Sequence, residues 1–115
     1  MNTIENEILT RTQMQALNEI KKMIRNKFNI ENIILYGSSV RGELDEESDI
    51  DLLIITQKAL SRKIRHKITE IVFEVNLKYE TNYSTFVVDY ESWENGLYSI
   101  LPIHEEIERE GVICE

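Results

Sequence analysis

Two aspartates separated by one residue, Asp49 and Asp51, open an apolar run that extends to Ile55. Side chains two positions apart on a β-strand point to the same face, with about 7 Å between their Cα atoms, so these carboxylates converge. Two like charges this close repel each other unless a cation lies between them. Carboxylate oxygens suit Mg²⁺, which takes its remaining ligands from water and substrate phosphates. The pair therefore predicts a site for a metal ion and a phosphate.

A glycine followed by two serines, Gly37, Ser38 and Ser39, supplies the other half of such a site. A strand that ends in glycine and continues into a short helix lets a phosphate approach backbone N–H groups at the positive helix end. The Ser38 hydroxyl adds a donor. Arg41 follows one turn later, and its spacing leaves two roles open: contact with triphosphate oxygens or pairing with the acidic loop that follows.

The elements that must position these residues follow from the spacing of the apolar residues. A spacing of three or four predicts helices, and runs of β-branched and aromatic residues predict strands. The expected helices and helical turns cover 10–28, 38–43, 59–79, 91–95 and 102–110. The expected strands cover 32–36, 49–56 and 83–90, with a short edge strand over 112–114. Helices that alternate with strands indicate an α/β (α+β) domain with a small mixed β-sheet flanked by helices.

Size and charge restrict the class of protein. A chain of 115 residues is expected to form a single domain over 1–115. The net charge of −8 argues against nucleic acid or anionic lipid bound over the whole surface. The basic run over 58–67 is either a solvated helix face or a surface that steers a triphosphate, an RNA acceptor or an acidic chain. No apolar run approaches the roughly 20 residues of a membrane span, and the N-terminus has no secretory pattern, so the expected location is the cytoplasm.

The motif of Gly37-Ser38, ten further residues and Asp49-Ile50-Asp51 resembles that of the DNA polymerase β-like nucleotidyltransferase superfamily. The likeness is closer to its minimal nucleotidyltransferase branch, small prokaryotic proteins often encoded beside a HEPN-domain partner. The segment 107–113 also resembles the tail common in that branch. The resemblance implies the nucleotidyltransferase fold.

The resemblance also implies roles for the motif residues. Asp49 and Asp51 would be catalytic and would hold up to two Mg²⁺ ions. The phosphates of ATP or another nucleoside triphosphate would lie near the predicted nucleotide-binding residues, which are Gly37, Ser38, Ser39 and Arg41. An acceptor hydroxyl would attack the α-phosphorus, with pyrophosphate leaving.

One expected catalytic group departs from the family pattern. Catalytic members usually carry a third carboxylate near the start of a later strand, where the order of elements here places Ser84 or Thr85. Asp89, at the far end of the same strand, is our candidate for the third catalytic acid. Without a third acid, catalysis would be slow, would borrow a group from a partner, or would be absent.

The resemblance favours Mg²⁺-dependent transfer of a nucleoside monophosphate, AMP from ATP, to a hydroxyl of a protein partner, with a HEPN-domain toxin as the expected acceptor. One alternative is a non-catalytic antitoxin that acts by occlusion. Another is a small-molecule nucleotidyltransferase of the aminoglycoside-modifying type, which is less favoured because no second domain is present to hold the drug. A homodimer is also expected, because exposed edge strands often pair. Nucleic acid is not expected to bind except as the acceptor, in the form of tRNA or another RNA. A membrane partner is not expected.

Overall fold

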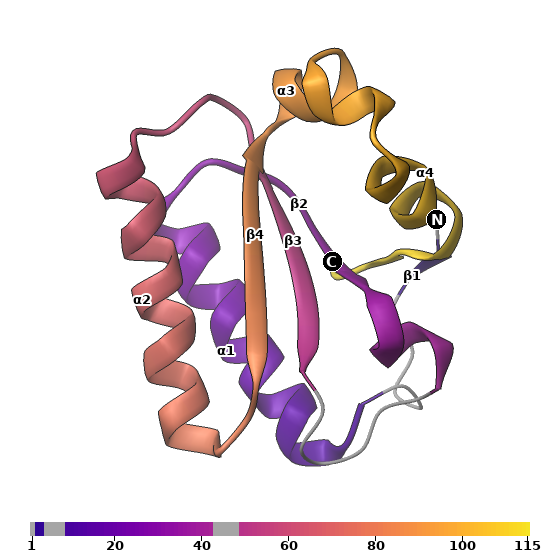
Figure 1. Cartoon of the computed structure of the whole chain (residues 1–115). Helices are drawn as coiled ribbons and strands as arrows, with labels where there is room; N and C mark the ends of the chain where they lie inside the picture. The colour runs from indigo at the N-terminus through magenta and orange to yellow at the C-terminus, as the bar shows by residue number, and fades with distance from the viewer. Residues whose placement is uncertain (1, 4–8, 43–48) are drawn as a thin grey trace.

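The computed structural model describes residues 2–3, 9–42 and 49–115. Its centre is a five-stranded mixed sheet with the strand order β1-β5-β2-β3-β4 (Figure 1). The strands are β1 (Asn2–Thr3), β2 (Ile30–Tyr36), β3 (Ile50–Thr56), β4 (Tyr83–Asp89) and β5 (Val112–Ile113). β3 runs antiparallel to β2 and parallel to β4, while β5 pairs antiparallel with β2 and parallel with β1.

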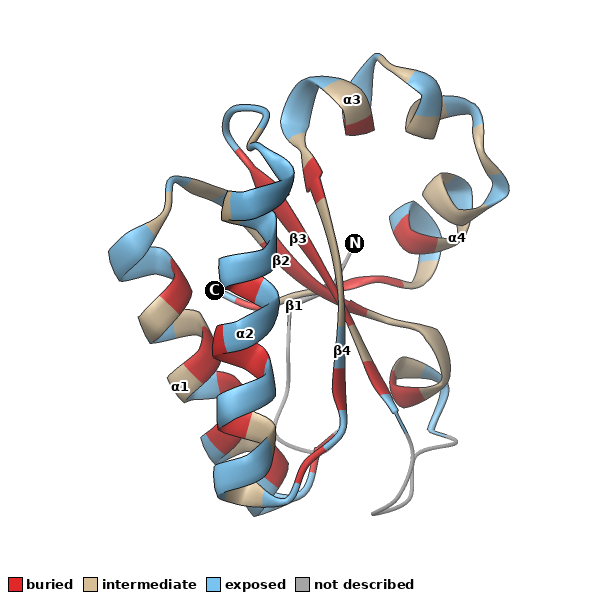
Figure 2. Ribbon diagram, turned by 60° about the vertical axis from the view of Figure 1, so that its left-hand side comes forward, coloured by how far each residue is buried: buried red, intermediate tan, exposed pale blue. Residues whose placement is uncertain are grey.

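Helices cover both faces of this sheet. They are α1 (Arg11–Lys27), the 3₁₀ turn η1 (Gly37–Arg41), α2 (Arg62–Tyr79), α3 (Tyr90–Glu94), the 3₁₀ turn η2 (Leu97–Ile100) and α4 (Pro102–Glu110). Figure 2 shows α1 and α2 against one face, and α3 and α4 on the other side. None of the helices in these ranges combines the length and apolarity that a bilayer crossing needs.

The core has one apolar cluster on each side of the sheet. Leu17 and Ile20 of α1 and Leu52 of β3 belong to the first cluster, while Leu53 and the fully buried Trp93 belong to the second. Successive side chains of β3 point to opposite faces, so its apolar run fills both clusters. This burial holds β3 rigidly between the helix layers, and the Asp49–Asp51 pair stands at its beginning.

Local signals explain where the elements begin and end. Thr10 and Gln13 form a reciprocal capping box that starts α1, and the Ser61 side chain caps α2. Pro102 begins α4, and the helix ends before Gly111.

Most predicted elements are confirmed, but β1 was not predicted, and other elements differ in their bounds or position. α2 begins three residues later than predicted, because Ser61 caps it. β2 begins two residues earlier, and η2 was not predicted. β5 is not an edge strand, because β1 pairs with its outer side. The acidic loop with which Arg41 was expected to pair covers 43–48 and lies outside the described residues.

Candidate functional site

The two predicted metal ligands lie at the start of β3, beside the end of β2. In the antiparallel β2–β3 ladder, Asp51 stands opposite Tyr36, the last residue of β2. Gly37 follows Tyr36 directly and begins η1. The register therefore brings the bend after the first long strand against Asp51, the second of the two acids that open the next strand.

The contact between Gly37 and Asp51 is close enough to require glycine. Gly37 has a φ of +80°, in the left-handed region that favours glycine. A Cβ built on Gly37 would lie 2.5 Å from Oδ2 of Asp51. A side chain at this position would therefore occupy the space of the carboxylate, and the missing Cβ leaves Asp51 facing the backbone of the bend.

The charges around Asp51 do not fully compensate the negative charge of its ionised carboxylate. Burial, and then the charge of Asp49, raise the pKa of the Asp51 carboxyl, while Arg41 opposes the shift. Glu106 of α4 adds a further negative charge. A cation at this place would offset the repulsion between the two aspartates.

The donor set fits Mg²⁺. Asp49 and Asp51 offer hard carboxylate oxygens, and Mg²⁺ is commonly held by one or two carboxylates together with substrate phosphates and water. In the described part of the chain, no group of three or more His, Cys, Asp or Glu side chains is arranged to hold a metal ion. Asp49 and Asp51 remain the candidate protein ligands within these ranges.

The serines of η1 differ in their surroundings. Ser39 is buried, and its hydroxyl donates to the carbonyl oxygen of Tyr36 at 3.2 Å. This bond ties the turn to the end of β2. Ser38 is half-buried and follows Gly37 directly. Of the two predicted nucleotide-binding hydroxyls, that of Ser38 is the better candidate, because that of Ser39 already holds the turn.

Arg41 joins η1 to α4. Its Nη1 lies 3.2 Å from a carboxylate oxygen of Glu106 and 3.5 Å from one of Glu110. The sequence left open a contact with phosphate or with the acidic loop, and this pairing with α4 was not foreseen. The positive charge of Arg41 also acts on Asp51, where it partly offsets the rise in the pKa of that carboxyl group.

Asp89 is not part of this cluster, and its prediction as the third catalytic acid is corrected. In the parallel β3–β4 ladder, Asp89 stands opposite Thr56, at the end of the sheet away from Asp51. Five residues of strand separate it from the level of Asp51, roughly 17 Å. Its carboxylate accepts from the backbone N–H and the hydroxyl of Ser92, which caps α3 and lowers the pKa of Asp89.

Ser84 occupies the position beside Asp51 on the neighbouring strand. The register pairs Asp51 with Ser84, one of the two residues that the order of elements placed there. A carboxylate at this point of β4 would stand next to the aspartate pair. Here the group is an exposed hydroxyl, so β4 contributes no third acid at this level.

An open hollow beside Asp49 contains residues that the sequence analysis did not single out. Phe73 and Leu77 of α2 line it together with Asp49, and both are exposed, by 61% and 67%. Neighbouring exposed apolar side chains can mark a binding surface. The available signal was their spacing of four residues, away from the buried side of α2.

Comparison with known families identifies the kind of domain in which this arrangement occurs. The family model described as "Polymerase beta, Nucleotidyltransferase" matches residues 18–111, which include the bend, the aspartate pair and β4. The chain belongs to this nucleotidyltransferase family. Asp49, Asp51 and Gly37 thus lie within the matched segment of a nucleotidyltransferase domain.

Relatives with assigned names point to one kind of transferase. "Putative protein adenylyltransferase MJ0141" of Methanocaldococcus jannaschii is 38% identical over 69 residues, which cover 58% of this chain and 70% of that protein. "Putative protein adenylyltransferase MJ1305" of the same organism is also 38% identical, over 76% of this chain and 60% of that protein. "Protein adenylyltransferase MntA" of Thermococcus cleftensis is 47% identical over 30% of this chain and 34% of its own length.

Solved structures share the fold. A structure titled "Crystal structure of the toxin-antitoxin with AMP-PNP" is similar over 84% of this chain and 69% of that chain, with a TM-score of 0.58 and 18% identity. A structure described as a tri-AMPylated Shewanella oneidensis HEPN toxin in complex with MNT antitoxin contains a chain that is similar over 89% of this chain and 70% of its own length, with a TM-score of 0.52 and 19% identity. The mixed sheet flanked by helices is thus the nucleotidyltransferase fold.

Proposed function

We propose that this chain transfers AMP from ATP to a hydroxyl group of a protein partner, with a HEPN-domain protein as the first partner to test. The names of the relatives support protein as the acceptor. The titles of two structural neighbours name AMP-PNP and an AMPylated HEPN toxin. Such a reaction uses ATP, so we place it in the cytoplasm.

One observation of this chain carries the proposal: the Asp51 carboxylate lies against the backbone of the Gly37 bend, with the charge of Asp49 beside it. A triphosphate needs an approach to backbone donors and a place where its charge is compensated. The bend supplies the first, and the aspartate pair supplies ligands for the second. Both lie at the same end of β3.

The proposed chemistry is a displacement at the α-phosphorus. A bond forms between the acceptor oxygen and the α-phosphorus, the bond to the bridging oxygen breaks, and pyrophosphate leaves. The hydroxyl proton passes to water or to a base of the partner, because Asp89 is remote and Ser84 is not an acid. Gly37 admits the phosphates to the backbone, and Ser38 donates to a phosphate oxygen.

Asp49 and Asp51 are the residues that would hold Mg²⁺. When bound there, the ion would neutralise phosphate charge and help to orient the triphosphate. The two aspartates then act as a unit, so the loss of either should abolish the function of both.

A second candidate is neutralisation of the partner by binding alone. Ser84 at the position beside Asp51 favours it, because a site to which β4 adds no carboxylate has a weaker means of activating the acceptor hydroxyl. In that case the chain would form the complex and transfer no AMP.

The deciding experiment incubates the chain with ATP labelled at the α-phosphate, Mg²⁺ and the protein encoded beside it. Transfer predicts label on the partner that is lost in Asp49→Asn and in Asp51→Asn. Asp89→Asn is the matched control, because Asp89 caps α3 far from the pair, and it should keep its transfer activity. A stable complex that forms without label would instead support occlusion, and failure to bind ATP with Mg²⁺ at millimolar concentrations would refute the catalytic proposal.

A further inference from the structure

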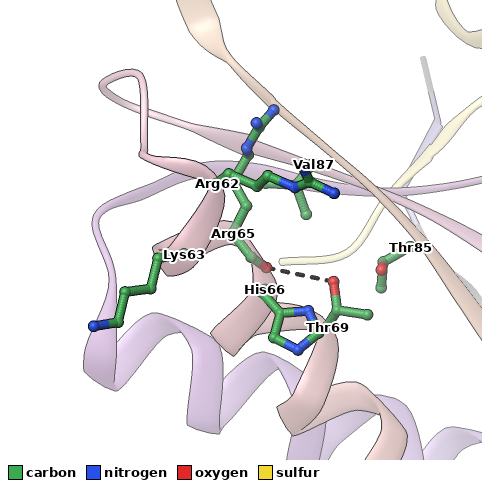
Figure 3. Close-up of a pocket in the computed structure, with 7 residues that line it drawn as sticks. All are labelled: Arg62, Lys63, Arg65, His66, Thr69, Thr85 and Val87. Carbon is green, nitrogen blue, oxygen red and sulfur yellow. Dashed lines mark hydrogen bonds between the residues drawn. The ribbon is translucent and has the colours of Figure 1, made fainter.

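The exposed side of α2 beside β4 forms a groove with basic side chains at one end. An open hollow of about 690 Å³ is lined by Arg62, Lys63, Arg65, His66, Thr69, Thr85 and Val87. Figure 3 shows Arg62 and Arg65 on the side of Val87, while Lys63 extends away from them. α2 has no acid in its first turn, and the chain as a whole carries a net charge of −8. The groove is therefore a local positive region on an acidic protein.

Two hollows lie along one stripe of α2: the basic groove, and the hollow beside Asp49. Arg62, Arg65, Thr69, Phe73 and Leu77 follow one another at intervals of three or four residues, which places them on one side of the helix. The last two line the second hollow, together with Asp49. The stripe is thus basic at the far end and apolar beside the site, and it spans about 23 Å at 1.5 Å per residue.

The other wall of the groove is the open edge of the sheet. β4 is the last strand in the sheet order of the described residues. At its start, the side chain of Asn76 accepts from the Tyr83 backbone N–H and donates to the Tyr83 carbonyl oxygen, both at 2.9 Å. Alternate residues of a strand direct their N–H and C=O groups to the same side. Thr85 and Val87 therefore direct theirs away from β3, where a further strand could pair.

We propose that this groove binds an extended acidic segment of the protein acceptor, which pairs with the β4 edge. Its carboxylates lie near Arg62 and Arg65, and its hydroxyl-bearing residue packs on Phe73 and Leu77, close to Asp49. The inference rests on the proposed function for the choice of a protein acceptor. A strand edge offers main-chain pairing to a peptide, whereas the net charge of −8 opposes RNA.

The length of the stripe defines a probe. An extended chain rises about 3.3 Å per residue, so the distance from Leu77 to Arg62 corresponds to about seven residues. The probe is a fluorescent peptide with a tyrosine at one end and a group of glutamates about seven residues away. A second peptide carries the same sequence with alternate backbone nitrogens methylated, which keeps the charge and removes strand pairing. Oligouridylate is the third probe.

Fluorescence anisotropy at low salt measures binding of each probe to the whole chain. The expected result is that Arg62→Glu with Arg65→Glu weakens binding of the first peptide by about tenfold or more. Lys22→Glu with Lys67→Glu is the matched control, because it makes the same change of net charge at exposed residues that line neither hollow. It should change the affinity less than threefold, and the methylated peptide should bind at least tenfold more weakly.

Three results would overturn the inference: equal losses in the two double variants, unchanged binding of the methylated peptide, or tighter binding of oligouridylate than of the peptide. Binding of ATP with Mg²⁺, measured on the same samples, separates the two proposals. Loss of peptide binding with ATP binding intact would refute the groove alone. Peptide binding by a chain that does not bind ATP would refute the proposed function and leave the groove in place.

Discussion

A single added methyl group at Gly37 should disturb both the functional site and the stability of the fold. The φ of this residue is +80°, and a Cβ would lie 2.5 Å from Oδ2 of Asp51. A left-handed alanine costs about 1–2 kcal/mol. Displacement of the carboxylate adds about 1–3 kcal/mol, as for other overpacked positions. We therefore expect Gly37→Ala to lower the free energy of unfolding by about 2–5 kcal/mol and to abolish binding of ATP with Mg²⁺.

Gly42 provides the matched control for the backbone effect. Its φ is +76°, and among the described residues beyond its chain neighbours no atom lies within 4 Å of a Cβ built there. Gly42→Ala should therefore lose only the conformational part, about 1–2 kcal/mol, and should bind ATP as the unmodified chain does. The difference between the two variants isolates the contact with Asp51.

Denaturant unfolding and calorimetric titration with ATP and Mg²⁺ are the assays. The contact itself is measured by adding Asp51→Ala to Gly37→Ala, because the nearest remaining atom of residue 51 would be its Cβ, at 3.7 Å. In that background Gly37→Ala should cost no more than Gly42→Ala. The reasoning is refuted if Gly37→Ala costs the same with and without the Asp51 carboxylate, or if it binds ATP within twofold of the unmodified chain.

Three further predictions concern the same site and its support. The pKa of Asp51 is raised above its ordinary value of 3.8, so its ionisation disfavours the folded state. Without Mg²⁺, thermal unfolding should therefore show Asp51→Asn to be the more stable protein at pH 7, and the difference should disappear below pH 3.8, where both side chains are neutral. Ser84→Asp should increase Mg²⁺ affinity in a titration and lower stability without Mg²⁺ by about 0.2–1 kcal/mol, because it adds a like charge beside Asp51; unchanged Mg²⁺ affinity would contradict this placement. The Tyr83 hydroxyl is buried and donates to the Gln13 carbonyl oxygen at 2.6 Å. Tyr83→Phe should therefore lower the free energy of unfolding by about 1–2 kcal/mol in denaturant unfolding. Tyr90→Phe, at an exposed position, should change it hardly at all.

The elements that hold the site could be predicted because their signals are local. The apolar spacing from Met14 to Ile24 and the run after Asp51 each depend on residues close in the chain. The start of α2 was predicted too early, since its apolar stripe extends before the capping residue Ser61. The role of β5 was wrong because β1 has only two residues and carries no periodic signal.

The sequence by itself determined the two halves of the site: a glycine bend after one strand and two acids, one residue apart, at the start of the next. Only the tertiary structure decided which residues meet there. The antiparallel register sets Asp51 on Gly37, while the parallel register places Ser84 beside Asp51 and carries Asp89 to the opposite end. Helical and strand periodicity arises between near neighbours, whereas the pairing of strands depends on packing between residues far apart in the chain, and no local pattern records it.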